Sequence, residues 1–258
     1  MNETDLINSW YAEIYDQHET QTDDVDFLLS ILGNKPKTIL EVCCGSGRIL
    51  VPLARAGHKA TGFDMDEFML ERIPAKAEGI ENLAFYKEDA VAADWGRDFD
   101  IVILAGNILI NIVTPLDYKE AQQLFIKKAA NSLKTGGYIY LDFNLFSNPE
   151  VIFGNNIERV IFEGTDCNGT YGKYSILEGT YDIDSQIYKG RNRTELITGS
   201  GEKIILEKEA TKYIPTLHDV YEWLENAGFV VEAEYGDYNG NPIDNNTCRT
   251  VIYARKVK

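Results

Sequence analysis

The sequence has 258 residues, of which 44% are hydrophobic and 26% are charged, and its formal net charge is −16. This length suits one large domain or one domain with an elaboration, and no apolar run is long enough to span a membrane. The negative charge disfavours nucleic acids and anionic membranes as partners, because both repel an acidic surface. The N-terminus lacks a secretory pattern and the four cysteines show no framework spacing, so we expect a cytoplasmic protein with reduced thiols.

The first part of the chain has helical periodicity. Apolar residues recur at helical spacing across residues 4–33, first at Leu6, Trp10 and Ile14 and again from Phe27. This spacing predicts two helices.

From residue 38 the pattern alternates between strand and helix. We expect five strands, at residues 38–43, 59–64, 82–89, 99–106 and 138–145, with helices at 48–56, 66–78 and 116–134 between them. This βαβ alternation predicts a parallel sheet with helices on both faces.

The pattern changes after residue 149. Residues 151–215 contain short alternating segments separated by turn signals such as Asn168-Gly169 and Asp184-Ser185. They predict an inserted antiparallel sheet of three or four strands. Thr216 then opens a helix, and we expect the last two strands to rejoin the main sheet as an antiparallel hairpin.

The stretch ILEVCCGSGR, residues 39–48, is a hydrophobic strand followed by a glycine-rich turn. Such a turn points backbone N–H groups at a ligand from the start of a helix. Dinucleotide-binding turns have the spacing G-x-G-x-x-G, where the third glycine allows close packing of helix on strand. Here Gly45 and Gly47 are followed by Leu50, which disfavours NAD and related dinucleotides.

The turn fits the pattern acid-x-G-x-G-x-G at three of four defining positions, Glu41, Gly45 and Gly47, with Cys43 at the first glycine position. On these residues the sequence resembles the first motif of class I S-adenosylmethionine (SAM)-dependent methyltransferases. Cysteine is small and apolar, so we interpret Cys43 as a tolerated substitution, provided that its backbone does not need a positive φ. The alternative is a reactive or metal-binding thiol. No histidine or second cysteine pair is placed to support a metal, so we expect no metal site.

Two further acids follow predicted strands, Asp64 after the second and Asp89 after the third. The resemblance implies that Asp64 accepts the ribose hydroxyls of SAM. It also implies that Asp89 binds the exocyclic amine of adenine and that the Ala90 N–H reaches a ring nitrogen. Asp64 would also suit NAD or a cap for a helix near Asp66, and Asp89 could be a solvated loop acid. The glycine-rich turn, Asp64 and Asp89 follow the first, second and third strands in that order, and this order favours SAM.

The resemblance extends to small-molecule N-methyltransferases related to glycine N-methyltransferase and to the antibiotic-sugar N,N-dimethyltransferases. Those enzymes carry an antiparallel sheet after the fifth strand and an N-terminal Y-x-x-x-Y-D-like helix, which Tyr11, Tyr15 and Asp16 match. The resemblance further implies that Tyr11, Met65 and Ala105 contact the cofactor.

These patterns predict an α/β fold with a Rossmann-like seven-stranded mixed sheet, helices on both faces and an inserted antiparallel β-sheet. The SAM-binding domain would comprise residues 1–148 and 216–258, with residues 1–33 as an N-terminal helical lid. Residues 149–215 would form the inserted subdomain, which binds the acceptor or mediates oligomerisation. The second role would give a homodimer.

The candidate catalytic residues are Asn107, Asp142 and Tyr15. Asn107 and Asn111 follow the fourth strand, and Asp142 and Asn144 lie near the end of the fifth. Tyr15 lies on a helix that could cover the site. An SN2 methyl transfer depends chiefly on in-line alignment of donor and acceptor. An amine acceptor must be neutral, so a nearby acid or tyrosine could take or steer its proton. For the tyrosines, core packing is the alternative.

Other features bear on the acceptor. Arg191 and Arg193 could hold a substrate carboxylate, although a solvated strand face is the simpler interpretation. The N/D-P-P-Y/F motif of methyltransferases that act on adenine or glutamine is missing after the fourth strand, where the chain reads AGNI, which argues against a nucleic-acid acceptor. We therefore predict a SAM-dependent methyltransferase that acts on a nitrogen or oxygen of a small molecule. The alternatives are an NAD-linked oxidoreductase and a non-catalytic SAM-binding protein.

Overall fold

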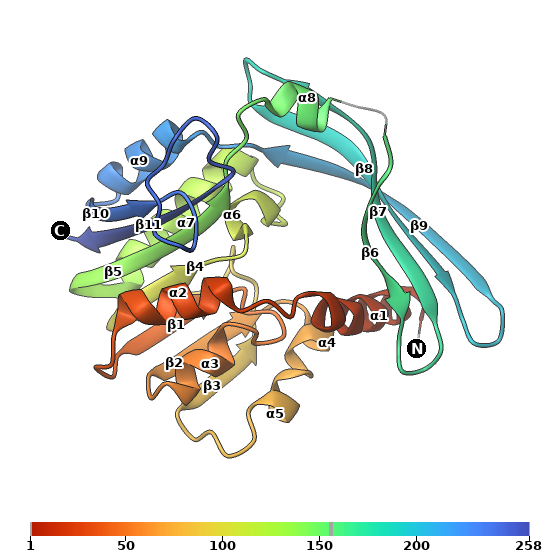
Figure 1. Ribbon diagram of the computed structural model, residues 1–258, viewed down its shortest axis with the longest axis horizontal. Coiled ribbons are helices and arrows are strands. Elements are labelled where there is room, and N and C mark those ends of the chain that lie inside the picture. The colour runs from red at the N-terminus through yellow and green to blue at the C-terminus, as the bar shows by residue number, and fades with distance from the viewer. Residues whose placement is uncertain (1, 155–156, 258) are drawn as a thin grey trace. The chain divides into compact units, whose positions relative to one another are not determined.

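The computed structural model describes residues 2–154 and 157–257, and the chain divides into two compact units. The α/β unit comprises Thr22–Ser147 and Pro215–Lys258, and the β unit comprises Met1–Gln21 and Asn148–Ile214. Figure 1 labels the elements of both units. Within the described ranges, no helix has the length and apolar character needed to cross a bilayer.

The α/β unit is built on a seven-stranded mixed sheet with the strand order β10-β11-β5-β4-β1-β2-β3. Its strands are β1 (Thr38–Val42), β2 (Lys59–Asp64), β3 (Leu83–Lys87), β4 (Phe99–Leu104), β5 (Leu133–Asn144), β10 (Phe229–Tyr235) and β11 (Arg249–Lys256). Strands β1 to β5 run parallel, whereas β11 is antiparallel to both β5 and β10. The predicted seven-stranded sheet and its closing hairpin are confirmed.

The helices of this unit are α2 (Asp23–Leu32), α3 (Leu50–Arg55), α4 (Glu67–Leu70), α5 (Ile73–Lys76), α6 (Ile108–Asn111), α7 (Tyr118–Ser132) and α9 (Leu217–Asn226). The expected single helix over residues 66–78 is wrong, because the chain forms two short helices there. Pro74 lies at the start of α5, where proline is tolerated but where it cannot continue a preceding helix.

Both faces of the sheet are buried, which explains the uniformly apolar strands. On one face, Ile39 and Ile103 pack in a core cluster with Leu28 of α2 and Leu50 of α3. On the other face, Trp95 packs edge-on against Phe125 of α7. The sheet is therefore held between helical layers, and its ligand edge is the one where the parallel strands end.

The β unit contains α1 (Glu3–His18), α8 (Pro149–Phe153) and an antiparallel sheet in the order β6-β7-β8-β9. Its strands are β6 (Arg159–Thr165), β7 (Tyr171–Asp182), β8 (Ile187–Ile197) and β9 (Lys203–Tyr213). The sheet therefore has the larger of the two expected strand counts.

Helix α1 belongs to the β unit because its apolar side packs on this sheet. Trp10 is fully buried, and its Nε1–H donates to the Gly164 carbonyl at 3.2 Å. A Cβ on Gly172 would lie 2.4 Å from the Trp10 ring, so glycine there makes room for the indole. The predicted lid, residues 1–33, is divided between the two units, because α1 belongs to the β unit and α2 to the α/β unit.

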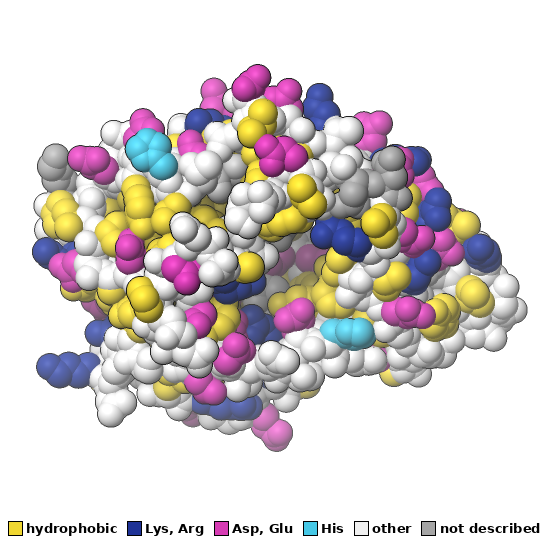
Figure 2. All heavy atoms as spheres, turned by 45° about the horizontal axis from the view of Figure 1, so that its top comes forward, with side chains coloured by type: hydrophobic (Ala, Val, Ile, Leu, Met, Phe, Trp, Pro, Cys, Tyr) yellow, Lys and Arg dark blue, Asp and Glu magenta, His cyan; other side chains and the backbone are white. Residues whose placement is uncertain are grey.

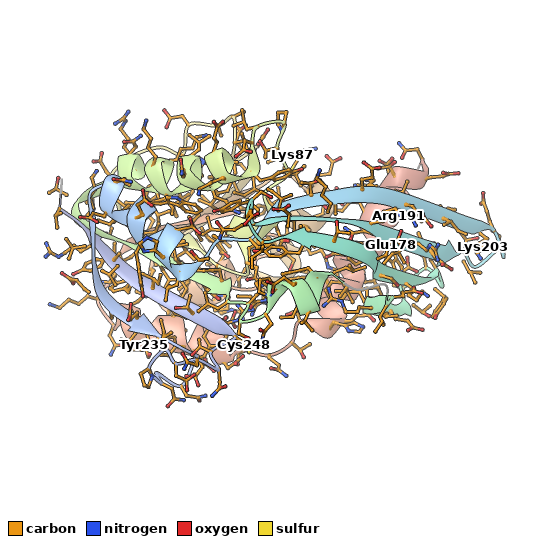
Figure 3. All side chains as sticks on the ribbon, turned by 90° about the horizontal axis from the view of Figure 1, so that it is seen from above. Lys87, Glu178, Arg191, Lys203, Tyr235 and Cys248 are labelled. Atoms are coloured by element: carbon orange, nitrogen blue, oxygen red, sulfur yellow. The ribbon has the colours of Figure 1, made fainter. Side chains whose placement is uncertain are left out.

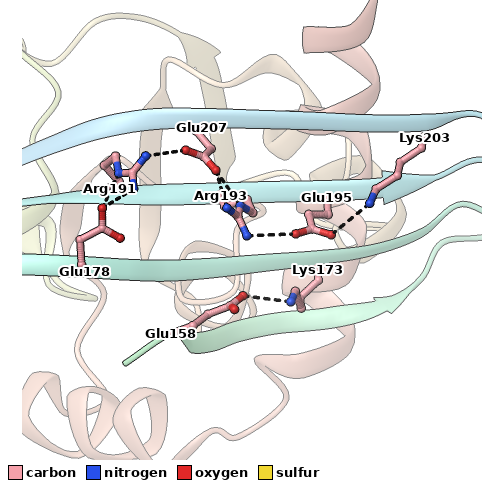
Figure 4. A network of polar contacts seen from close by, with 8 residues as sticks. All are labelled: Glu158, Lys173, Glu178, Arg191, Arg193, Glu195, Lys203 and Glu207. Atoms are coloured by element: carbon pink, nitrogen blue, oxygen red, sulfur yellow. Dashed lines mark hydrogen bonds and ion pairs between the residues drawn. The ribbon is translucent and has the colours of Figure 1, made fainter. Parts of the chain in front are cut away.

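One face of this sheet carries a ladder of ion pairs (Figure 4). Arg191 binds Glu178 and Glu207, and Arg193 binds Glu207 and Glu195. Figure 3 shows Arg191 beside Glu178 on this sheet. These contacts favour the solvated strand face over a site for a substrate carboxylate. On the molecular face in Figure 2, acidic side chains are likewise interspersed with lysines and arginines.

Candidate cofactor site

The loop after β1 is held to the end of β2 by a carboxylate. The Gly45 N–H donates to Asp64 Oδ2 at 2.9 Å, and the Asp66 N–H donates to Asp64 Oδ1 at the same distance. The cap of α4 is Asp66, whose Oδ1 accepts the Phe68 and Met69 N–H groups. Asp64 is therefore free of the capping role and lies at the carboxyl edge of the sheet, where a ribose would bind.

Glycine is required at positions 45 and 47 of this loop for different physical reasons. Gly45 has φ +52°, and a Cβ there would meet nothing within 4 Å, so this backbone faces open space. Gly47 has φ +77°, and its Cβ would lie 3.0 Å from Ile73. The close approach of α3 to the sheet uses Gly62 of β2, where a Cβ would lie 2.6 Å from the Leu50 side chain. The leucine that breaks the dinucleotide pattern is thus part of the packing.

Cys43 adopts a left-handed backbone with φ +57°. The condition for an unstrained substitution is therefore not met, because a side chain in this region costs about 1–2 kcal/mol. Burial, reinforced by the nearby Asp64 and Glu41 carboxylates, raises the pKa of the Cys43 thiol well above its usual value. The thiol therefore stays protonated at neutral pH, which disfavours a reactive cysteine. The described residues contain no group of three metal-binding side chains.

Glu41 lies near the end of β1 and is 5% exposed. Its Oε2 has no hydrogen-bond partner among the described residues. Burial raises the pKa of this carboxyl to about 8, with Arg48 lowering it and Asp64 and Asp24 raising it further. A buried polar atom without a partner at a ligand edge is an observation that calls for a ligand or water.

Arg48 and Asp24 form a bidentate ion pair that was not predicted from the sequence. Arg48 donates to both carboxylate oxygens of Asp24, at 2.8 and 2.6 Å, and Asp24 is buried in the first turn of α2. The pair joins α2 to the cofactor loop. The arginine directly after the last motif glycine was a signal for it, but only the fold identifies the acid that it meets.

Asp89 and Ala90, which are predicted to contact adenine, lie in the loop after β3. Asp89 is exposed, and its Oδ1 accepts the Val91 N–H at 2.8 Å. Ala90 is buried, and its carbonyl accepts from Lys128 Nζ and from Trp95 Nε1 at 2.9 Å. Lys128, also missed from the sequence, binds the carbonyls of Val91 and Ala93 as well and so fixes this loop.

The other predicted cofactor contacts lie in different places. Met65 follows β2 and is 52% exposed, which leaves a large apolar side chain available beside Asp64. Ala105 follows β4 and packs on the core cluster of the α2 face. Tyr11 is in the β unit, where its ring packs edge-on against Phe162 and Tyr174.

The ends of β4 and β5 are joined through Asn107. This residue has φ +65°, and its Oδ1 accepts the Asn144 N–H at 2.6 Å. Its own N–H donates to the Asp142 carbonyl at 3.3 Å. Asn111 is exposed at the end of α6. The structure thus brings Asn107, Asp142 and Asn144 together at the carboxyl edge of the sheet.

The Asp142 side chain is committed to other groups. It is 1% exposed, its Oδ1 pairs with Arg249 at 2.5 Å, and its Oδ2 accepts the Tyr238 hydroxyl at 2.5 Å. Tyr15, in the β unit, packs against Phe162. These contacts favour a structural role for Asp142 and agree with core packing as the alternative for Tyr15.

Comparison with known proteins identifies the domain. A family model described as a methyltransferase domain matches residues 39–137, which include the cofactor loop and both strand-end acids. The crystal structure of an S-adenosylmethionine-dependent methyltransferase from Clostridium acetobutylicum ATCC 824 superposes with a TM-score of 0.73. That likeness covers 96% of this chain and 98% of the other at 17% identity. Residues 39–137 therefore match a methyltransferase domain, and the chain has the fold of class I methyltransferases.

Two further similarities extend over most of the chain. A putative methyltransferase from Geobacillus sp. (strain WCH70) is 26% identical over 222 residues, which are 85% of each protein. The sugar N-methyltransferase KedS8 from Streptoalloteichus sp. ATCC 53650 superposes with a TM-score of 0.70 at 15% identity, over 96% of this chain and 93% of the other. At this identity the structural likeness shows the fold.

The residues of the α/β unit fit SAM as the cofactor. Gly45 leaves open space beside its backbone, and Glu41 offers a buried oxygen without a partner. Asp64 and Asp89 place carboxylates after two adjacent parallel strands. The positive charge of SAM suits a site that holds the carboxyl groups of Glu41, Asp64 and Asp89.

Proposed function

We propose that this methyltransferase transfers a methyl group from SAM to a nitrogen of a small-molecule amine. When bound, SAM supplies an electrophilic methyl group on a positively charged sulfur. The methyl joins the lone pair of the acceptor, the electrons of the broken C–S bond stay on sulfur, and the acceptor loses a proton to water. The observation that carries the cofactor part of this proposal is the pair of acidic loops after β1 and β2, which the Asp64 side chain joins.

Asn107 is the residue that we assign to the acceptor. Its Oδ1 already accepts the Asn144 N–H, so we assign its amide N–H groups to an oxygen of the acceptor molecule, away from the nitrogen whose lone pair attacks. We also propose Tyr15 as a group that steers the proton of the acceptor amine. Asp142 is a weaker candidate, since Arg249 and Tyr238 occupy both of its oxygens.

The choice of a small amine has two supports. The net charge of −16 disfavours a nucleic-acid acceptor. The sugar N-methyltransferase named above shares the fold over nearly the whole chain, including the inserted sheet. We propose that residues 149–215 recognise the acceptor or form a homodimer. Light scattering of the purified protein distinguishes a monomer from a dimer.

Calorimetric titration with SAM, S-adenosylhomocysteine and NAD tests the cofactor assignment first. We expect micromolar binding of SAM and S-adenosylhomocysteine and no heat with NAD. A panel of amino sugars and other small amines, each paired with the matching alcohol, then tests the acceptor by mass spectrometry of the products. A gain of one methyl group on the alcohols alone would replace the amine with a hydroxyl acceptor, and SAM binding without turnover of any compound would favour the non-catalytic alternative.

Asn107→Gly separates acceptor positioning from cofactor binding. Glycine keeps the left-handed backbone and removes the amide, so we expect kcat to fall about tenfold or more with little change in the Kd for SAM. Asn226→Ala removes an exposed amide at the end of α9 and serves as the matched control. An unchanged kcat in Asn107→Gly would remove this residue from the mechanism.

A further inference from the structure

The cofactor loop between β1 and α3 contains a tight turn at residues 44–47. The Gly47 N–H donates to the Cys44 carbonyl at 2.9 Å, which closes a four-residue β-turn. Gly45 has a positive φ at the first central position and Ser46 does not, which is the sign pattern of a type II′ turn. A single backbone hydrogen bond is a weak constraint, so the shape of this turn depends on the groups that hold it from outside.

Two side chains hold successive residues of the turn. Asp64 accepts the Gly45 N–H from the end of β2. Lys76, in the short helix α5, holds the next residue, because its Nζ donates to the carbonyl and to the hydroxyl of Ser46, both at 2.9 Å. Since Ser46 is 1% exposed, water does not readily take the place of the ammonium group. The sequence gave no signal for this contact, which joins residues thirty positions apart.

Lys76 is itself held against the loop by its surroundings. Arg55 of α3 donates to the Lys76 carbonyl, which ties the backbone of α5 to the helix that follows the loop. The first turn of α5 also lies close to the loop, since a Cβ on Gly47 would lie 3.0 Å from the Ile73 side chain. The ammonium group of Lys76 therefore reaches the turn from a packed segment and has a defined direction.

We propose that Lys76 is a positioning residue that sets the affinity of the site for its cofactor by holding Ser46 in the binding conformation of the loop. This role rests on SAM being the cofactor and on no particular acceptor. Lys76 acts through the loop, so its loss lowers the fraction of molecules whose loop is ready to bind. SAM and S-adenosylhomocysteine would use the same loop, and both therefore lose affinity by the same factor.

Lys76→Met keeps the aliphatic stem and removes the ammonium group. We expect the Kd values for SAM and S-adenosylhomocysteine to rise together by about tenfold, because two hydrogen bonds from a charged donor are lost. At saturating SAM we expect kcat to stay within about twofold of wild type, since uniform binding does not change the chemical step. Titration calorimetry and initial rates measure the two effects, and a role in stability alone would change neither.

Two further variants define the matched comparison. Lys76→Arg keeps a charged donor and should restore most of the affinity. Lys127→Met removes an exposed lysine from α7 and should bind both ligands as the wild type does. Each variant is first checked for wild-type thermal unfolding.

Ser46→Ala tests the other end of the contact. It removes the hydroxyl and leaves the carbonyl, so we expect a smaller rise in Kd, of about threefold. Combined with Lys76→Met, it should cost less affinity than the sum of the two single changes. Without ligand, amide hydrogen exchange in the peptide that covers residues 43–48 should be faster in Lys76→Met than in the wild type or Lys127→Met.

Wild-type Kd values in a folded Lys76→Met protein, or a rise for only one of the two ligands, would overturn the inference. Unchanged hydrogen exchange at residues 43–48 would overturn it as well. If Lys76→Met does not fold, Ser46→Ala decides, because an unchanged Kd for SAM in that variant contradicts the role of the contact. Failure of SAM to bind the wild type at all would instead count against the proposed function, so the two failures are distinct.

Discussion

The Asp64 carboxylate accepts the N–H of Gly45 at 2.9 Å and the N–H of Asp66 at the same distance. One side chain thus joins the loops after two neighbouring parallel strands, β1 and β2. The ribose-binding acid implied by the resemblance is therefore also the group that sets the shape of the cofactor loop.

Asp64→Asn should weaken SAM binding by about tenfold to a hundredfold, because an amide cannot accept both backbone N–H groups and the charge is lost. Titration calorimetry measures the effect. Asp66→Asn is the matched control, since asparagine still caps α4. Binding of SAM by Asp64→Asn with wild-type affinity would contradict a cofactor role for this carboxylate.

Cys43→Gly should raise the free energy of unfolding by about 1 kcal/mol, because glycine adopts φ +57° without a Cβ penalty. Denaturant unfolding followed by circular dichroism measures the gain. Cys43→Ala keeps a Cβ in the same left-handed backbone, and we expect no such gain from it. Equal stabilisation of the protein by Cys43→Ala and Cys43→Gly would show that backbone strain at residue 43 is not the source of the gain.

Asp24→Asn should destabilise the protein by about 3–5 kcal/mol, because it leaves the Arg48 guanidinium without its buried partner. In a double-mutant cycle, Asp24→Asn with Arg48→Gln should cost less than the sum of the two single changes. Glu207→Gln provides the contrast, since its partners Arg191 and Arg193 lie on the solvated ladder, and we expect about 1 kcal/mol or less. Strict additivity in the cycle would argue that the buried pair contributes no coupling.

The stability of the protein without ligand should depend on pH through Glu41. Its folded pKa is raised from 4.5 to about 8, so the folded state holds a proton that the unfolded state releases. This contribution is fully present below pH 4.5 and is lost as the pH rises through 8, at about 1.4 kcal/mol per pH unit between the two values. Thermal melts of wild type and Glu41→Gln between pH 5 and 8 measure how the stability of each protein changes with pH. The same change in both proteins would exclude Glu41 as the source of the pH dependence.

Much of the fold follows from local patterns. The apolar strands β1 and β4 and the glycine turn between β1 and α3 are encoded within a few residues each, which is why the sheet and the cofactor loop were predicted. The single helix expected over residues 66–78 failed because Pro74 divides it. A helical period shows an apolar face but does not show whether the helix is continuous.

The partners of buried charges were not predictable in the same way. Asp142 stands at a strand end, where ligand-binding acids are expected, yet its side chain meets Arg249 from a strand more than a hundred residues later. The left-handed backbone of Cys43 is likewise set by the loop geometry and not by the residue itself. Assigning α1 to the β unit required knowing that Trp10 fits over Gly172.

The burial of Trp10 also has a consequence for the order of folding. Its cluster contains Ile7 and Ile14 from the first helix together with Phe162, Leu196 and Ile204 from the sheet. During synthesis the apolar side of this helix stays exposed until almost two hundred further residues have been added. Contacts so distant along the chain form slowly, so the start of the chain is the segment for which a chaperone would have the longest opportunity to bind.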